Sequence, residues 1–161
     1  MATPALDRAV RVRSGNSRDL DEVMEVMDTA FGDRFGEAWT RSQCAGILPM
    51  AGVSLMVARE LESGAAIGFS LSRMVADEAE LLLLAVIPSH HREGIGNLLL
   101  DDFMHRARDA GAMRVHLEVR DGNPAVEMYL RAGFTAVGRR SKYYHARNGT
   151  RFDALTLAQD F

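Results

Sequence analysis

A turn with two glycines is the first feature of the sequence whose residue types and spacing could do chemistry. It comprises Arg92-Glu93-Gly94-Ile95-Gly96, follows an apolar run and leads into a helix-like stretch. The first N–H groups of a helix have no partner inside the helix, the helix dipole adds partial positive charge there, and glycine lets the backbone approach an anion closely. The turn could therefore hold a pyrophosphate or only start a helix, and the glycines alone leave both interpretations open.

Rival motifs for phosphate or metal chemistry do not occur in the sequence. There is no Gly-x-x-x-x-Gly-Lys-Ser/Thr, and Leu99 stands where Gly-x-Gly-x-x-Gly would need its third glycine. His116-x-Glu118 is not followed by the Pro-Cys-x-x-Cys of zinc deaminases, and the five histidines lack His-Glu-x-x-His spacing. We therefore expect neither a P-loop nucleotidase nor a metal site.

Composition indicates one ordinary globular domain, which we expect to span residues 1–161. The chain is 47% hydrophobic and 25% charged, with a formal net charge of −3. This balance argues against a general affinity for nucleic acid or for anionic membranes. The single cysteine, Cys44, excludes an internal disulfide and a multi-thiolate metal site. A reducing, cytoplasmic location is the resulting expectation.

Two further observations bear on that location. The first 13 residues contain no apolar segment of the kind that a signal peptide needs. The longest apolar run, residues 81–88, is far shorter than the roughly 18 residues of a membrane span. Neither secretion nor membrane insertion is expected from these segments.

The elements that would position the glycine turn follow from hydrophobic periodicity. The predicted strands cover 10–13, 53–59, 66–74, 80–87, 114–119, 134–144 and 152–157, and the predicted helices cover Ser17 to about Gly32, a segment after the Thr40/Gln43 capping box, 95–110, and Asn123 to Gly133. The strand at 80–87 is nearly continuous in apolar residues, which predicts a central strand covered on both faces. Its link through helix 95–110 to the strand at 114–119 predicts a right-handed parallel crossover.

With the turn set after a central strand, the sequence resembles the Gcn5-related N-acetyltransferase (GNAT) superfamily. The signature of that superfamily is Gln/Arg-x-x-Gly-x-Gly/Ala, and His91 stands at its first position here. The segments EAELLLLAVIP, HLEVRDGNPAVEMYLRAGF and RRSKYYHARNGTRFDALTL resemble those of the bacterial ribosomal-protein alanine N-acetyltransferases. The resemblance covers most of residues 52–157, whereas residues 1–50 match only in the order of their elements.

The resemblance implies a fold class and a co-substrate. The fold is α/β (α+β): a mixed, mostly antiparallel twisted sheet of about seven strands, flanked by about four helices, with a parallel, splayed strand pair at its centre. The co-substrate is acetyl-CoA, whose pantetheine arm pairs with the central strand and whose pyrophosphate lies on the turn, without a metal. The cofactor-binding residues that it implies are Leu84, Ala85, Val86, His91, Arg92, Glu93, Gly94, Ile95, Gly96, Asn97 and Asn123.

Glu118 is the candidate general base for acetyl transfer to an amine. It lies on the polar face of the strand at 114–119, where a solvated strand glutamate is the alternative, and its match to the family's base position favours the catalytic role. A pKa of about 7.8 makes the neutral form of an α-amine cost only about 1 kcal/mol at pH 7, against roughly 4 to 5 kcal/mol for a lysine. A carboxylate that acts through water could serve an α-amine far more easily.

Tyr129 is the candidate general acid. Its phenol stays protonated at neutral pH and could donate a proton to the departing thiolate, whereas the alternative is a core aromatic residue. The segment between Glu118 and Tyr129 is one residue shorter than the family pattern, so that either Gly122 or Asn123 stands at the family's cofactor-contacting asparagine.

Tyr143 and Tyr144 are neighbours in a predicted strand and should point to opposite faces. At most one of them should then line the acceptor groove, and Tyr143 is the substrate-binding candidate.

The reaction that the resemblance implies is direct transfer in a ternary complex to the N-terminal α-amine of a protein, alanine-type, with a ribosomal protein as the candidate partner. Two alternatives stay open: transfer to a small amine or a lysine, and a non-catalytic coenzyme A-binding module, which His91 and the shortened spacing motivate. We expect a monomer or a homodimer, with no direct nucleic-acid or membrane partner.

Overall fold

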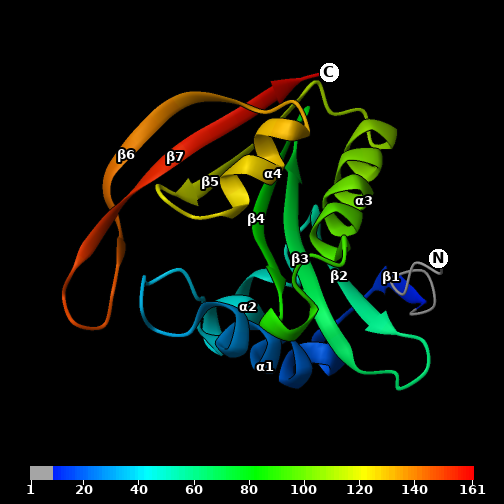
Figure 1. The fold of residues 1–161 in the computed structure, drawn as a ribbon. Helices are drawn as coiled ribbons and strands as arrows, with labels where there is room; N and C mark the ends of the chain where they lie inside the picture. Colours follow the sequence, from blue (N-terminus) through cyan, green and yellow to red (C-terminus); the bar gives the residue numbers. More distant parts are fainter. Residues whose placement is uncertain (1–8) are drawn as a thin grey trace, which may run out of the picture.

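The computed structural model describes residues 9–161, and its seven strands form one mixed sheet (Figure 1). The strands are β1 (Val10–Ser14), β2 (Val53–Glu60), β3 (Ala66–Val75), β4 (Glu78–Val86), β5 (Arg114–Arg120), β6 (Thr135–His145) and β7 (Arg151–Asp160). Their order in the sheet is β1-β2-β3-β4-β5-β7-β6, and the pair β4–β5 is parallel whereas the other pairs are antiparallel. The predicted meander, the central position of β4 and the parallel pair are confirmed.

Helices cover both faces of this sheet. They are α1 (Leu20–Phe31), α2 (Arg41–Ile47), α3 (Ile95–Asp109) and α4 (Ala125–Arg131), with single 3-10 turns η2 (Ser17–Asp19) and η3 (Pro88–His90). One core joins α1 and α2 to β2, β3 and β4, and a second joins α3 and α4 to β4, β5 and β7. In Figure 1, α1 and α2 lie at the lower part of the sheet, and α3 and α4 lie at its upper part.

The predicted helix starts are close to those observed. The capping box at α2 is present in full, because Thr40 Oγ1 accepts from the Gln43 N–H and Gln43 accepts from the Thr40 N–H. The predicted helix from Asn123 begins at Ala125, with Pro124 and not Asn123 at the N-cap position of α4. Asn123 nevertheless caps it, since its side-chain oxygen accepts the N–H of Ala125 at 2.8 Å.

Strand β4 contributes residues to cores on both faces of the sheet, as predicted. After the exposed Glu78, buried residues alternate with half-buried ones to the end of the strand. The register with β3 shifts within the apolar run, because Leu71 pairs with Leu83 whereas Ser72 pairs with Leu81, which leaves Leu82 as an extra residue in a β-bulge. Leu81 packs into the core under α3 and α4, whereas Leu83 packs into the core under α1 and α2. The apolar run of β4 is uninterrupted because its residues contribute to two cores on opposite faces of the sheet.

Strands β4 and β5 separate at this bulge. Their parallel pairing runs from Glu78↔Arg114 to Leu81↔Leu117, and beyond it β5 continues beside β7 while β4 continues beside β3. The splayed parallel pair is therefore present. The edge of β4 over residues 82–86 that would face β5 has no ladder partner among the described strands.

Candidate active site

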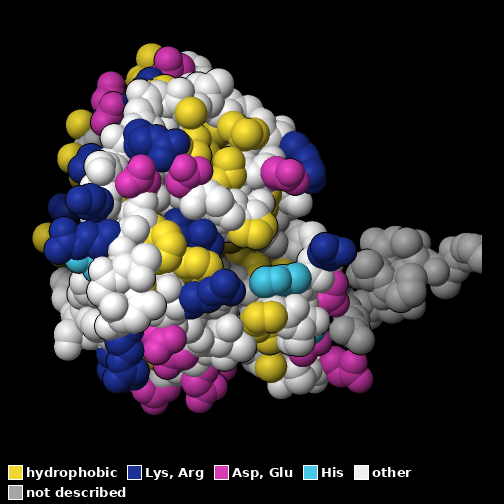
Figure 2. Space-filling model, turned by 60° about the vertical axis from the view of Figure 1, so that its left-hand side comes forward, with side chains coloured by type: hydrophobic (Ala, Val, Ile, Leu, Met, Phe, Trp, Pro, Cys, Tyr) yellow, Lys and Arg dark blue, Asp and Glu magenta, His cyan; other side chains and the backbone are white. Residues whose placement is uncertain are grey.

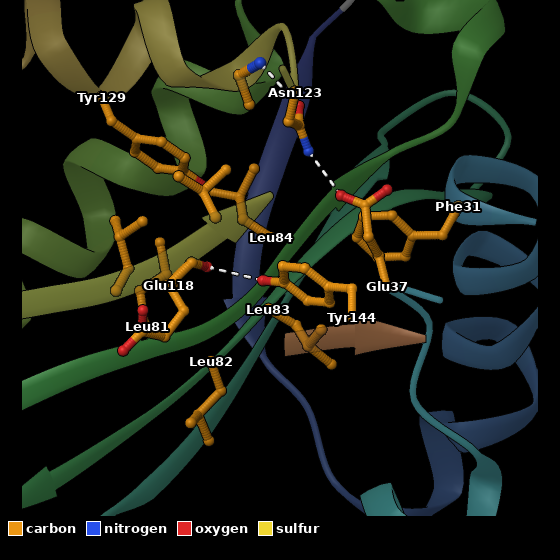
Figure 3. A pocket seen from close by; sticks show the side chains of 13 residues that line it. Phe31, Glu37, Leu81, Leu82, Leu83, Leu84, Glu118, Asn123, Tyr129 and Tyr144 are labelled. Atoms are coloured by element: carbon orange, nitrogen blue, oxygen red, sulfur yellow. Dashed lines mark hydrogen bonds between the residues drawn. The ribbon is translucent and has the colours of Figure 1, made fainter. Parts of the chain in front are cut away.

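The opening between β4 and β5 leads into two adjoining pockets. The first, here the Tyr129 pocket, is lined by Phe31, Glu37, Leu81, Leu82, Leu83, Leu84, Leu117, Glu118, Val119, Asn123, Ala125, Tyr129 and Tyr144 (Figure 3). The second, here the Tyr143 pocket, is lined by Glu37, Trp39, Glu80, Leu81, Leu82, Leu83, Glu118, Tyr143 and Tyr144. Because six residues line both, the two pockets form one continuous cleft between the splayed strands.

The surface around the β6–β7 hairpin carries both apolar and charged side chains. In Figure 2, where the side of the molecule that carries this hairpin comes forward, apolar side chains gather in the middle of the face, among lysine or arginine and aspartate or glutamate side chains. An acceptor that reaches this face would meet both apolar and charged groups.

Glu118, the candidate base, projects from β5 into both pockets. Its side chain is 10% exposed, and both of its oxygens are engaged. Arg140 Nε lies 2.9 Å from Oε1, and the Thr156 hydroxyl donates to Oε2 at 2.7 Å. These contacts fix the orientation of the carboxylate in the cleft.

Tyr129, the candidate acid, comes from α4 on the opposite side of the Tyr129 pocket from β4. Tyr129 is 6% exposed, and its ring packs edge-on against the Phe134 ring with the two centroids 5.9 Å apart. Burial, together with the nearby charge of Glu37, raises the pKa of the Tyr129 phenol above its ordinary value of 10. The hydroxyl is therefore a protonated donor throughout the neutral range.

The two neighbouring tyrosines of β6 correct a prediction from strand alternation. Tyr143 and Tyr144 both line the Tyr143 pocket, with their rings edge to face at 4.9 Å. The reason is an irregularity in β6: Lys142 has a φ of 52°, and the register with β7 shifts between Arg140 and Tyr144. This bulge breaks the alternation that the prediction assumed.

The two rings have different environments inside the cleft. Tyr144 is more buried, and its hydroxyl donates to the Glu118 carbonyl oxygen at 3.3 Å. Burial, with lesser contributions from Tyr143 and the carboxylates of Glu37 and Glu118, raises the Tyr144 pKa. Tyr143 is 46% exposed and is the more accessible of the two to an acceptor.

Glu37 is a residue of the cleft that the sequence reasoning missed. It lies between α1 and α2, lines both pockets and has a side chain that is 10% exposed. Its partners come from the far end of β5 and the start of α4: Arg120 Nε at 3.3 Å from Oε1, and Asn123 Nδ2, which donates to Oε2 at 2.8 Å (Figure 3). Asn123 is 86 residues away in the chain, so no local sequence pattern could predict this contact. Trp39 and Glu80 were missed for the same reason.

Asn123, a candidate cofactor residue, lines the Tyr129 pocket but uses its amide within the chain. Its nitrogen donates to Glu37, and its oxygen caps α4 at the Ala125 N–H. Gly122 lies beside it with a φ of 90° and has no side chain to offer. Asn123 thus joins the β5–α4 junction to the α1–α2 loop.

The glycine turn joins the C-terminal end of β4 to α3. Gly94 occupies the cap position of α3 with a φ of 83°, and Arg92 also has a positive φ of 64°. The N–H groups of Ile95, Gly96 and Asn97 belong to the first helical turn, where no carbonyl of the helix is available to them. The turn adjoins the cleft, because a Cβ added to Gly96 would lie 4.0 Å from a methyl group of Leu84.

His91 makes a contact within the chain that fixes the geometry of the turn. Its Nε2 lies 2.9 Å from the carbonyl oxygen of Val86, so this ring nitrogen carries the proton and donates. Next to it, His90 Nδ1 lies 2.9 Å from a carboxylate oxygen of Glu93. His91 therefore ties the turn back to the last residue of β4.

The described residues hold neither a cluster of metal ligands nor a helix able to span a membrane. Within residues 9–161, no three His, Cys, Asp or Glu side chains are grouped so that they could hold a metal ion. Among the helices of the same residues, none is long and apolar enough to cross a membrane.

Comparisons with known proteins agree with the fold and identify the family. The family described as "Acetyltransferase (GNAT) family" matches residues 20–134. A [ribosomal protein bS18]-alanine N-acetyltransferase of Haemophilus influenzae is 35% identical over 98 residues, which are 61% of this chain and 67% of that protein. The protein of the same name from Escherichia coli K12 is 34% identical over 98 residues, which are 60% of this chain and 66% of that protein.

A solved structure is similar over nearly the whole length. The crystal structure of the ribosomal-protein-S18-alanine N-acetyltransferase from Escherichia coli matches with a TM-score of 0.84 and 25% identity, covering 94% of each chain. The sequence alignments span about two thirds of the length of the relatives, whereas the fold match covers 94% of each chain.

Proposed function

The chain belongs to the acetyltransferase (GNAT) family, whose members use acetyl-CoA, and we propose that it acetylates the N-terminal α-amine of a protein that begins with alanine. One observation supports the proposal most directly. The Glu118 carboxylate and the protonated Tyr129 phenol line the same pocket, beside the unpaired edge of β4. A ribosomal protein is the candidate acceptor, because relatives with 34–35% identity are named for that substrate.

Backbone groups support binding of acetyl-CoA. The edge of β4 over residues 82–86 offers N–H and C=O groups to an extended chain such as a pantetheine arm, in the manner of an added strand. The first N–H groups of α3, reached through Gly94 and Gly96, suit a pyrophosphate. When bound, acetyl-CoA supplies an activated acetyl group as a thioester.

Side chains of the cleft support the transfer itself. The acceptor amine must lose a proton and attack the thioester carbonyl, so that a C–N bond forms as the C–S bond breaks. In our proposal Glu118 receives the amine proton, directly or through one water, and Tyr129 gives its proton to the departing sulfur. The raised pKa of Tyr129 suits a donor that must stay protonated until the thiolate forms.

The α-amine is favoured over a lysine on energetic grounds. Its neutral form costs about 1 kcal/mol at pH 7, whereas that of a lysine costs roughly 4 to 5 kcal/mol. Arg140 and Thr156 hold the Glu118 carboxylate in place with two hydrogen bonds, so that its orientation in the cleft is fixed before an acceptor binds.

A steady-state assay with two matched peptides tests the proposal. One peptide begins with a free alanine and carries no lysine, and the other has the same sequence with a blocked N-terminus and one lysine. We expect acetyl-CoA-dependent turnover of the first peptide only. Turnover of the blocked peptide alone would contradict the proposal. Calorimetric binding of acetyl-CoA without transfer to either peptide would indicate a non-catalytic module.

A further inference from the structure

Arg120 is a buried cation beside the cleft that the mechanism above does not use. It is the last residue of β5, and its side chain is 9% exposed. The guanidinium carbon lies 3.6 Å from the centre of the Phe35 ring, and Nε lies 3.3 Å from Glu37 Oε1. A desolvated arginine that is both stacked and ion-paired is strongly oriented. Arg120 therefore has a fixed position relative to two residues of the α1–α2 loop.

The α1–α2 loop, residues 32–40, forms one wall of the cleft. Glu37 and Trp39 line the pockets from this loop. The loop has no regular secondary structure of its own, so contacts to other elements must hold it in place.

Contacts from β6, β7 and the junction between β5 and α4 assist Arg120 in holding the loop. The Phe35 ring, whose face Arg120 covers, meets Phe152 of β7 edge-on at 5.2 Å. Gly36 lies so close to His145 that an added Cβ would overlap the His145 carbonyl group. Asn123 holds the second oxygen of Glu37. Arg120 differs from these partners because it alone among them contacts both Phe35 and Glu37.

We propose that Arg120 is a positioning residue for the acceptor, which holds the α1–α2 loop so that the Glu37 carboxylate faces the incoming amine end of the peptide. The proposal rests on the proposed function, because it requires that the cleft receives a peptide acceptor. Arg120 lines neither pocket, so it acts through Glu37 and Phe35. Glu37 keeps one charge-paired oxygen and one amide-bonded oxygen, and the lone pairs that remain are free to accept from an amine.

Replacement of Arg120 should therefore affect the acceptor and leave acetyl-CoA unaffected. In R120M the buried Glu37 loses its cation and the Phe35 ring loses its stacking partner. We expect the KM of the alanine peptide to rise at least tenfold, with kcat within threefold and the KM of acetyl-CoA within twofold of the wild type. R120K, which restores the charge, should recover part of the peptide KM.

A double-variant comparison separates action through Glu37 from a general structural effect. E37Q alone should raise the peptide KM about as much as R120M, and R120M/E37Q should raise it no further. The control is R139M, which removes an arginine that pairs with Asp121 and Asp153 at the surface, with a side chain that is 52% exposed, and that lines neither pocket. R139M should leave both KM values unchanged.

Hydrogen exchange gives a readout that needs no turnover. In R120M, backbone amides of residues 32–40 should exchange at least tenfold faster, while those of β4 and α3 keep their wild-type rates. Should R120M fail to fold, F35L removes the stacked ring and should produce the same local change and the same rise in peptide KM.

Three results would overturn the assignment: a fall in kcat at unchanged peptide KM, additive effects in R120M/E37Q, or unchanged exchange in residues 32–40. A wild-type enzyme that acetylates only the blocked lysine peptide would refute the proposed function instead. In that case the same KM comparison on the lysine peptide, together with the exchange data, still decides the role of Arg120.

Discussion

The two halves of the cleft are built in different ways. The half that we assign to acetyl-CoA is a continuous stretch of chain, from the edge of β4 over residues 82–86 through His91 to the first turn of α3. The half that we assign to the acceptor is assembled from the α1–α2 loop, the end of β5 and the β6–β7 hairpin. The first is held by hydrogen bonds between residues close in sequence, and the second by contacts such as Asn123–Glu37 across 86 residues.

Because the two halves are built differently, a substitution in one half should leave ligand binding in the other half unchanged. A local turn depends on backbone conformation at a few positions, so a change there should affect one ligand. A wall held by long-range side-chain contacts depends on several elements at once, so a change in any of them should affect the other ligand. The two halves should therefore respond independently to substitution, except where they meet.

The acetyl-CoA half and the acceptor half of the cleft meet at Tyr129, where we expect a substitution to have the largest effect on activity. Y129F keeps the ring packing against Phe134 but removes the proton donor, so kcat should fall about 100-fold or more, with both KM values little changed. Steady-state kinetics measure this. An acetyl thioester of a thiol with a lower pKa needs less help from an acid, so the deficit of Y129F should shrink with that donor. An equal deficit with both donors would argue against the role as acid.

Gly36 tests the acceptor half. In G36A the new methyl group would overlap the backbone of His145, and at a φ of 72° alanine is strained as well, so the α1–α2 loop must move. The peptide kcat/KM should fall between about tenfold and 100-fold, because small misplacements at a reacting centre are costly. The affinity for acetyl-CoA, measured by calorimetry, should not change.

The matched control for Gly36 is Gly32, at the start of the same loop. Gly32 has a φ of 59°, and an added Cβ there meets only a backbone oxygen of Asp28 at 4.0 Å. G32A should therefore produce conformational strain without the overlap and a much smaller loss of peptide turnover. Equal losses in G32A and G36A would mean that strain, not the contact with His145, sets the effect.

Gly94 tests the acetyl-CoA half. At a φ of 83° a left-handed conformation costs an L-residue about 1 to 2 kcal/mol, and Gly94 has open space around it, so G94A should distort the turn without a clash. The affinity for acetyl-CoA should weaken by about 5- to 30-fold, while the peptide KM at saturating acetyl-CoA stays constant.

Gly111 provides the control at the other end of α3. It has a φ of 91° and equally open surroundings. G111A should lower stability by an amount similar to G94A but leave acetyl-CoA binding unchanged, which a calorimetric titration of both variants would show. If G111A weakened binding as much as G94A, the turn would have no special role.

The smallest effect is a pH dependence of stability. The pKa values of Tyr129 and Tyr144 are raised above 10 in the folded protein, mainly by burial. Above about pH 10 the unfolded chain releases these protons while the folded chain keeps them, so the free energy of unfolding falls as pH rises, by up to about 1.4 kcal/mol per pH unit for each tyrosine. Denaturant titrations between pH 9 and pH 11 should show a shallower fall in Y129F.

Much of the fold could be predicted because its signals are local. The capping box at Thr40 and the apolar period of α3 each depend on a few neighbouring residues, and the structure confirms both. The resemblance to the GNAT superfamily is likewise confirmed. The bulges in β4 and β6 were missed, because an extra residue shows in a sequence only as a shift in an apolar–polar alternation, and neither the apolar run of β4 nor the largely exposed β6 has such an alternation.

The site was predictable to the extent that its residues lie in such local motifs. Glu118 and Tyr129 could be singled out from β5 and α4, and the structure brings both into one pocket. Glu37 and Arg120 could not be singled out. A glutamate in a loop and an arginine at a strand end belong to no local motif, and only the fold brings the two side chains into contact. The roles of all four stay predictions for the experiments above.

The bulge at Leu82 has a consequence for how the protein could change over evolution. On either side of it, Leu81 and Leu83 face opposite cores, as they would in a regular strand without Leu82. A single-codon deletion of Leu82 would keep Leu81 and Leu83 in their cores, would remove one partly buried contact from the core under α1 and α2, and would abolish the divergence of β4 from β5, which begins at Leu81. The opening between β4 and β5 thus depends on one inserted residue, whereas most of the packing depends on its neighbours.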